Sequence, residues 1–262
     1  MLAPGEGRVG SLAWTRETKG KLVPRDYPPL VGQLVLVLGK GVPERILGRF
    51  GLLRGFREVS ERHLRPPDED SASLKAQDEA EKLCRRLTPS FLIGHSRRTY
   101  TWASILAARD RIAVDHTVLY VACLLHDVGL SEAHRGPAPP ACFTLVGAKQ
   151  ARRICLSAGW PEERSRKTEE AITLHMNPQV RRRDGAEAEL LSRGSQLDVL
   201  GIGFWALTRG ARAWVLGRFP REAAKEGFAE LFRREHHHPG SRAHLYSRLG
   251  IRWLIRAAPF DD

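Results

Sequence analysis

The chain has 262 residues, of which 42% are hydrophobic and 27% are charged, so it can bury a sizeable core and has the composition of a soluble globular protein. Lys and Arg number 42 against 30 Asp and Glu, a formal net charge of +12 that favours anionic ligands without choosing among them. The basic residues are spread along the chain, and no basic stripe interleaved with aromatic residues indicates nucleic-acid binding.

The four cysteines are too scattered for CxxC pairs, and Cys123 lies inside an apolar run. This pattern predicts reduced, buried thiols rather than a disulfide framework. No charged start followed by an apolar stretch indicates a secretory signal, so we expect a cytoplasmic protein. The longest apolar segment near the N-terminus, residues 30–38, is too short to span a membrane, and we expect no membrane partner.

Residues 1–73 are interpreted as a less regular N-terminal segment and linker. The first 50 residues are rich in Gly and Pro and carry one short apolar strand or helix at 33–38. Residues 66–73 are Pro-rich and acidic and have no apolar periodicity, which is typical of a linker or a plain surface loop.

From residue 74 onward the apolar positions recur with helical spacing. We expect Asp115 to be the N-cap of a central helix that stops at Gly129. Pro89 and Gly94 should break the preceding pattern, and Gly147 should interrupt the next helix early. The predicted helices cover residues 74–87, 96–111, 117–127, 143–158, 168–176 (with a start near Pro161) and 187–200. The fold class is therefore all-α: a helical bundle over residues 74–205 and a helical extension, 206–262, packed on it.

An apolar run from Val118 ends in the adjacent pair His126 and Asp127, which are costly to bury unless something pairs with them. His95 and Asp198 are two further polar residues in helical, largely apolar surroundings. Residues so far apart in sequence lie on different helices, and bundles build metal sites from side chains on facing helices. Two imidazoles and two carboxylates suit one divalent metal ion, such as Zn, Fe, Mn or Ni, with positions left open for water and substrate. We therefore predict His95, His126, Asp127 and Asp198 as metal ligands.

Other polar residues near this set leave more than one role open. Arg97 and Arg98 follow His95 closely, and helical neighbours point about 100° apart, so one should face the site and bind an anion while the other is solvated. His175 lies on an apolar helix. Its alternative roles are a core histidine, a support for the metal ligands or a substrate contact, and we assign it to the pocket because a buried polar ring without a partner is costly. Glu132 and His134 follow the metal pair in a segment that either covers the pocket or is plain surface.

The order His95, His126-Asp127, Asp198 resembles the HD-domain superfamily of metal-dependent hydrolases. Blocks 95–100, 119–130, 143–148, 171–175 and 197–201 are similar to the cyanamide-hydratase-like branch. The resemblance implies an all-helical fold with these four residues as metal ligands. As a mechanism we hypothesise catalytic roles for Asp127, which orients the water or acts as base, and for His175, Arg97 or Arg98, which stabilise developing charge. Where that branch has two acidic residues, this chain has Thr144 and Val146, which makes Thr144 a candidate substrate contact together with Arg97 and His175.

Three functions follow as hypotheses. The first is a hydrolase that uses metal-activated water on a small phosphoester, which the superfamily and the positive charge favour. The second is a hydratase that adds water to a small nitrogenous molecule such as a cyanamide-like nitrile, which the branch favours. The third is a non-catalytic, nucleotide-binding HD module. We expect a small, anionic substrate and no nucleic-acid partner, and a homo-oligomer is compatible with the sequence.

Overall fold

The protein was analysed as a computed structural model that describes residues 7–50, 52–53, 55–67, 70–134, 141–233 and 236–261. All regular elements in these residues are helices, and the extended backbone forms only two isolated bridges. The all-α fold class is therefore confirmed. No helix among the described residues combines the length and the apolar character needed to cross a membrane.

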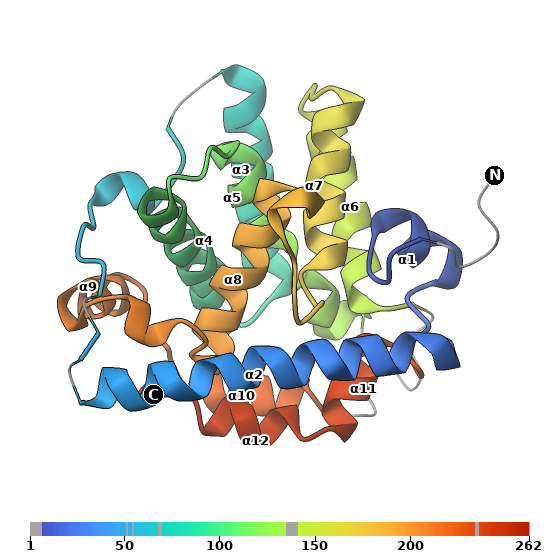
Figure 1. The fold of residues 1–262 in the computed structure, drawn as a ribbon. Helices are drawn as coiled ribbons and strands as arrows, with labels where there is room; N and C mark the ends of the chain where they lie inside the picture. The colour runs from blue at the N-terminus through green and yellow to red at the C-terminus, as the bar shows by residue number, and fades with distance from the viewer. Residues whose placement is uncertain are drawn as a thin grey trace.

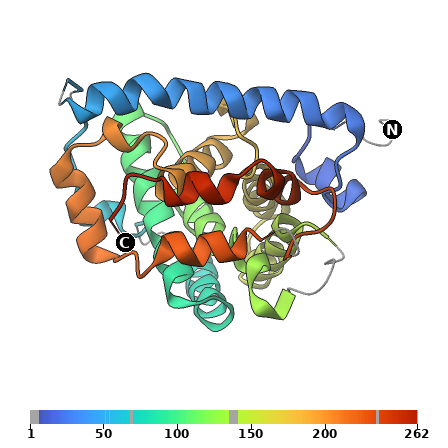
Figure 2. The same ribbon diagram turned by 90° about the horizontal axis from the view of Figure 1, so that it is seen from below.

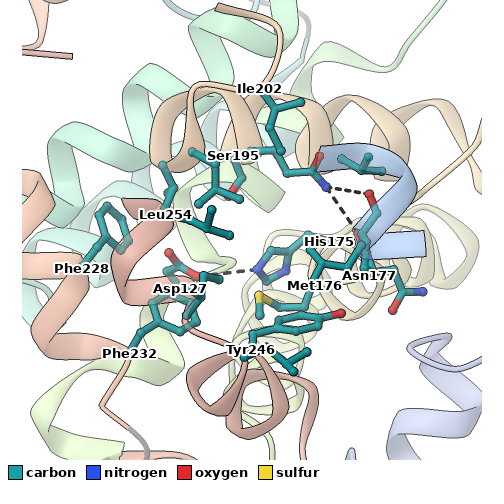
Figure 3. Close-up of a pocket in the computed structure, with 18 residues that line it drawn as sticks. Asp127, His175, Met176, Asn177, Ser195, Ile202, Phe228, Phe232, Tyr246 and Leu254 are labelled. Carbon is teal, nitrogen blue, oxygen red and sulfur yellow. Dashed lines mark hydrogen bonds and ion pairs between the residues drawn. The ribbon is translucent and has the colours of Figure 1, made fainter. Parts of the chain in front are cut away.

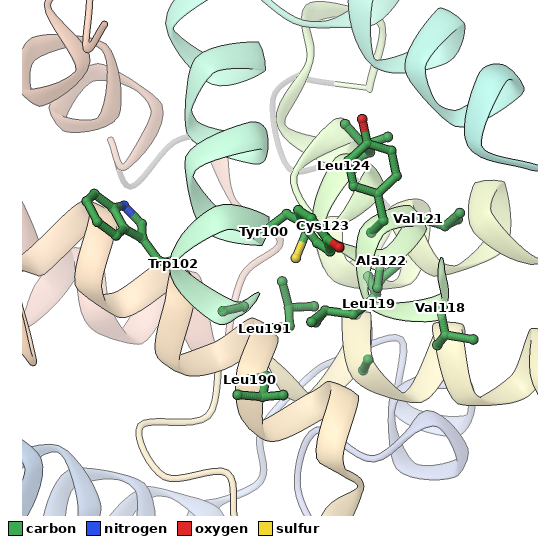
Figure 4. Packing of buried hydrophobic residues seen from close by; sticks show 14 of the residues in the cluster. Tyr100, Trp102, Val118, Leu119, Val121, Ala122, Cys123, Leu124, Leu190 and Leu191 are labelled. Atoms are coloured by element: carbon green, nitrogen blue, oxygen red, sulfur yellow. The ribbon is translucent and has the colours of Figure 1, made fainter. Parts of the chain in front are cut away.

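Six helices build the bundle, and α5 lies among them (Figure 1). Every residue of α5 from Thr117 to Leu125 is buried, because α5 packs against α3, α4, α6, α7 and α8. Figure 4 shows Leu119 and Cys123 of α5 packed in the core with Tyr100 of α4 and Leu191 of α8. The bundle helices are α3 (Ser71–Leu87), α4 (Ser90–Asp110), α5 (His116–Leu125), α6 (Phe143–Ser157), α7 (Glu162–Leu174) and α8 (Ala186–Leu200).

The ends of α5 position the predicted metal pair. The Asp115 side chain accepts hydrogen bonds from the amides of Thr117 and Val118, which confirms it as the N-cap. The helix ends at Leu125, two residues earlier than expected, and Asp127 has φ −109° and ψ 3°. Asp127 therefore leaves the helical path just before a short turn, Val128–Leu130, and His126 and Asp127 lie at the helix end rather than inside it.

Two of the predicted helix breaks are wrong. Pro89 takes the N-cap position of α4, where its lack of an N–H costs nothing, so the helix starts at Ser90. It then continues through Gly94 without a break. His95 is consequently in the second turn of α4. The helix α6 also continues through Gly147, where a Cβ would lie 2.6 Å from the Leu125 carbonyl oxygen. The glycine is needed for close approach of α6 to the end of α5, not for a break.

The N-terminal segment is more regular than expected. It forms α1 (Leu12–Thr18) and α2 (Tyr27–Arg49), a helix of 23 residues in place of the short element predicted at 33–38. Proline in the first turn of α2 is compatible with helix because the first amides have no intrahelical partner. Leu30 and Leu34 of α2 pack with Leu245 and Tyr246, while Val35 is exposed. Residues 68–69 of the predicted linker lie outside the described residues.

The C-terminal region lies along α2 at one end of the bundle (Figures 1 and 2). There α10 contacts α4, and α12 contacts α8 and α10. Helices distant in sequence from the metal pair thus close the bundle below it. They are α9 (Arg209–Arg218), α10 (Ala224–Leu231), α11 (Arg242–Arg248) and α12 (Ile251–Arg256).

Candidate metal centre

Three of the predicted ligands converge at the end of α5. The Nε2 atoms of His95 and His126 are 3.0 Å apart. Asp127 Oδ2 lies 3.5 Å from His95 Nε2 and 3.3 Å from His126 Nε2. All three side chains are buried, and their ligand atoms lie close enough together to hold one metal ion.

Hydrogen bonds at the opposite ring nitrogens orient the imidazoles. His126 Nδ1 is 2.8 Å from the Cys123 carbonyl oxygen, and His175 Nδ1 is 2.6 Å from that of Ile172. A carbonyl only accepts, so each Nδ1 carries the proton and each Nε2 of the neutral ring has a lone pair. His95 Nδ1 lies 2.8 Å from Asp198 Oδ2, and the same argument applies. The lone pairs of His95 and His126 therefore face each other.

This arrangement fits a divalent cation. Two imidazole lone pairs at 3.0 Å repel each other unless a proton or a cation lies between them. Nitrogen ligands at about 2.0–2.1 Å from one ion are separated by about 3 Å when they subtend a right angle, so the observed spacing suits a shared ion. Burial lowers the pKa of His126, but Asp127, the Cys123 carbonyl and Asp198 together outweigh it, and the net pKa is raised. Burial alone would raise the pKa of Asp127, but the neighbouring histidines, His126 foremost, hold it well below its usual range.

The structure places Asp198 behind His95. Oδ2 accepts from His95 Nδ1 at 2.8 Å and from Arg98 Nη2 at 3.0 Å. Oδ1 accepts from Arg98 Nε at 2.8 Å and from Trp102 Nε1 at 3.0 Å. A carboxylate has about four lone-pair sites, and these four donors use them. Burial opposes ionisation, but Arg98 and His95 hold the pKa of Asp198 far below its usual range. In this arrangement Asp198 orients His95 and does not reach the three converging ligand atoms.

The arginines that follow His95 are both engaged elsewhere. Arg98 is fully buried, and besides Asp198 it donates to the Pro220 carbonyl oxygen at 2.7 Å. Arg97 pairs with Glu81 of α3 at 3.3 Å and lies over the Phe219 ring. Neither is among the pocket-lining residues described below. Arg97 is half-buried rather than freely solvated, and the inward arginine, Arg98, serves Asp198 instead of presenting an anion site to the pocket.

His175 adjoins the cluster beside His126 and Asp127. Its Nε2 lies 3.7 Å from Asp127 Oδ1, and its ring packs edge-on against His126 with centroids 4.9 Å apart. Burial, and then the charge of His126, lower the pKa of His175 to about 3, so the ring is neutral near pH 7. His175 is also one of the residues that line the pocket described next.

A pocket of about 80 Å³ opens on Asp127 and His175 (Figure 3). Its walls come from α2, α8 and the C-terminal helices, and Phe228, Phe232 and Leu254 surround the carboxylate in the close-up. The described lining includes no Lys or Arg. Apart from Asp127 and His175, its polar side chains are those of Asn177, Ser195, Gln196 and Tyr246.

Sequence reasoning missed the walls of this pocket and one buried cation. Arg242 of α11 is fully buried and donates to Asn177 Oδ1 at 2.6 Å and to the Thr173 carbonyl oxygen at 2.8 Å. Its third contact, at 3.4 Å, is Thr144 Oγ1, so Thr144 lies against Arg242 rather than among the pocket-lining residues. No motif marks Arg242 or Tyr246. Only the apolar run at 33–38, which contains Leu34 and Val37, hinted at the α2 wall.

Comparison with protein families agrees with this geometry. A family model described as HD domain matches residues 92–200, which include all four predicted ligands. The matched segment is therefore similar to the HD-domain family. HD domains typically bind a divalent metal, and the family points to metal-dependent hydrolases in general. No curated protein matches the chain.

Proposed function

We propose that the protein adds metal-activated water to a small, uncharged organic molecule, with nitrile-like nitrogen compounds as the first class to test. One observation carries the proposal: the pocket that opens on Asp127 and His175 is walled by aliphatic and aromatic side chains, with no Lys or Arg in its described lining. Such walls favour a neutral substrate, because burying an unpaired anion there would be costly. The small volume of about 80 Å³ favours a molecule of few atoms.

His95, His126 and Asp127 would hold the ion through two Nε2 atoms and a carboxylate oxygen. A divalent metal bound there supplies a Lewis acid and lowers the pKa of a bound water towards neutrality. Asp198 fixes His95 so that its Nε2 points inward. His175, neutral and held through Nδ1, presents Nε2 as a proton acceptor beside Asp127. Asp127 and His175 are thus the proposed proton-handling residues.

The phosphoester hypothesis receives less support. A phosphate dianion is usually recognised by guanidinium or ammonium groups besides the metal. Here Arg97 forms an ion pair with Glu81, and Arg98 forms one with Asp198, so neither guanidinium is placed to bind a phosphate in the pocket. The phosphoester hypothesis is still supported by the net charge of +12 and by the family match, but neither observation concerns the residues of this pocket.

The test is a metal analysis of the purified protein, followed by a panel of neutral nitriles, cyanamide and amides beside phosphomonoesters. We expect one bound divalent metal ion and turnover of a neutral compound. His126→Ala should abolish metal binding and turnover together, whereas His238→Ala removes a histidine that does not line the pocket and should retain both. Phosphate release without turnover of any neutral compound would contradict the proposed substrate class. A stoichiometric metal with no turnover of any compound would favour a binding module.

A further inference from the structure

A second cavity, of about 730 Å³, lies at the far end of α4 from the metal centre. It is bounded by the C-terminal turn of α4, the start of α5 and the segment around the short helix Glu61–His63, which contacts α4. His95 lies in the second turn of α4 and Arg111 is its C-cap, so the 16 residue steps between them span about 24 Å of helix. The cavity is therefore distinct from the pocket at Asp127.

The rim of this cavity is cationic. Arg62, Arg65 and Arg111 line it, and each is exposed to solvent. Within the described part of the chain, none of these three guanidinium groups has a carboxylate partner. The acidic residue in the lining, Glu61, pairs with Arg218 of α9. The positive charge at this rim is thus uncompensated, which favours an anion that can accept several hydrogen bonds.

A buried, unsatisfied donor lies in a residue of the same wall. His63 is 3% exposed, and its Nδ1 accepts a hydrogen bond from the Ser60 amide at 3.1 Å. In a neutral imidazole with Nδ1 as acceptor, Nε2 carries the proton. Burial, and then Arg62, lower the pKa of His63, so the neutral form is favoured. Nε2 is buried and has no hydrogen-bond partner, so a donor remains unsatisfied in a residue that lines the cavity.

Apart from Ser104 and His116, the remaining wall is apolar. Ala107 and Ala108 of α4, with Ile112 and Pro66, give a surface against which a flat or apolar group can pack. We propose that this cavity binds a small phosphate-bearing molecule with a planar or apolar portion, of the mononucleotide class, at a site separate from the metal centre. The phosphate contacts the guanidinium groups, and the planar portion packs on the alanine wall.

The test titrates AMP and inorganic phosphate into the metal-loaded full chain and measures binding by calorimetry. We expect AMP to bind at millimolar concentration or tighter, and more tightly than phosphate, because only AMP uses the apolar wall. The double variant Arg62→Gln/Arg65→Gln and the single variant Arg111→Gly should each weaken AMP binding about tenfold or more. Glycine at 111 tolerates the left-handed backbone found there, φ 53°. Metal content should be unchanged in both.

Arg248→Gln is the matched control, because it removes one exposed cation from the end of α11, outside the cavity. AMP affinity should be retained in it. No AMP binding to the parent chain would overturn the proposal. Equal weakening by Arg248→Gln and by the cavity variants would also overturn it, since that result assigns AMP to the general positive charge. If inorganic phosphate bound as tightly as AMP does, the proposed role of the apolar wall would be overturned.

Discussion

His95 and His126 lie with their Nε2 atoms 3.0 Å apart, and each ring is held there by a hydrogen bond from its other nitrogen. Two lone pairs in this position stabilise the fold only when a cation or a proton separates them. Asp127 sits within 3.5 Å of both nitrogens and favours the positive charge. The pair therefore links metal binding to stability, and it leads to the first prediction.

Removal of divalent metal should lower the midpoint of thermal unfolding. An ion that binds the folded chain at about 100 times its Kd contributes about 2.7 kcal/mol, which corresponds to about 5–10 °C for a domain of this size. Scanning calorimetry with and without a chelator measures the shift, and added metal should reverse it. His126→Ala should show no response to metal. An equal response in that variant would place the ion elsewhere.

Asp198→Asn tests the role of the buried carboxylate. The change leaves the Arg98 charge without its counter-ion, so we expect the free energy of unfolding to fall by about 3–5 kcal/mol. Metal affinity should fall about 10–100-fold, because His95 loses the group that orients it. Denaturant titration and metal competition measure these quantities. Asp110→Asn, at an exposed ion pair, should cost about 0–1 kcal/mol. Unchanged metal affinity in Asp198→Asn would remove Asp198 from the site.

Gly194→Ala tests the close packing of α8 on α4. A Cβ at this position would lie 2.5 Å from the Thr99 carbonyl oxygen, so α8 must move away from α4 and carry Asp198 with it. We expect about 1–3 kcal/mol of destabilisation and weaker metal binding. Gly210→Ala is the control, since nothing lies within 4 Å of an added Cβ there, and it should stabilise α9 by about 0.5–1 kcal/mol. Equal effects of the two substitutions would contradict the packing argument.

Val37→Trp and Val35→Trp compare the two faces of α2. Val37 lines the pocket, whereas Val35 is 63% exposed on the same helix. Filling the pocket from Val37 should raise KM or abolish turnover of the neutral substrate while metal content stays the same. Val35→Trp should have the kinetics of the parent chain. If Val37→Trp kept those kinetics as well, the pocket would not be the substrate site.

Asp115→Ala should show a pH-dependent loss of stability. Burial would raise the pKa of Asp115, but Arg164 and the α5 amides outweigh it, and the net pKa is lowered. A folded-state pKa below the unfolded value of about 3.9 gives stability that is present above that value and is lost as the pH falls. The variant should therefore lose about 0.5–2 kcal/mol near neutral pH, and the difference from the parent should shrink below about pH 4. Urea titrations across this range measure the trend, and a difference that grows on acidification would contradict it.

Several features of the protein follow from local sequence alone. The all-α class, the N-cap at Asp115 and the His126-Asp127 pair at the end of a buried helix depend on neighbours within a few residues. Local hydrogen bonds and apolar spacing determine such features, so sequence is sufficient for them. The same reasoning misplaced the breaks at Gly94 and Gly147, because a glycine that faces a closely packed neighbour looks the same in sequence as one that ends a helix.

Tertiary structure decided the rest. The tautomer of His95 depends on Asp198, more than 100 residues away, and the same contact occupies the carboxylate that sequence predicted as a metal ligand. The pocket walls come from α2 and the C-terminal helices, and the cationic cavity joins Arg62 and Arg65 to Arg111. Helical periodicity tells which face of a helix is buried but not which remote side chain meets it. That pairing is set by how the helices pack, and it determined where charge, lone pairs and space for ligands come together.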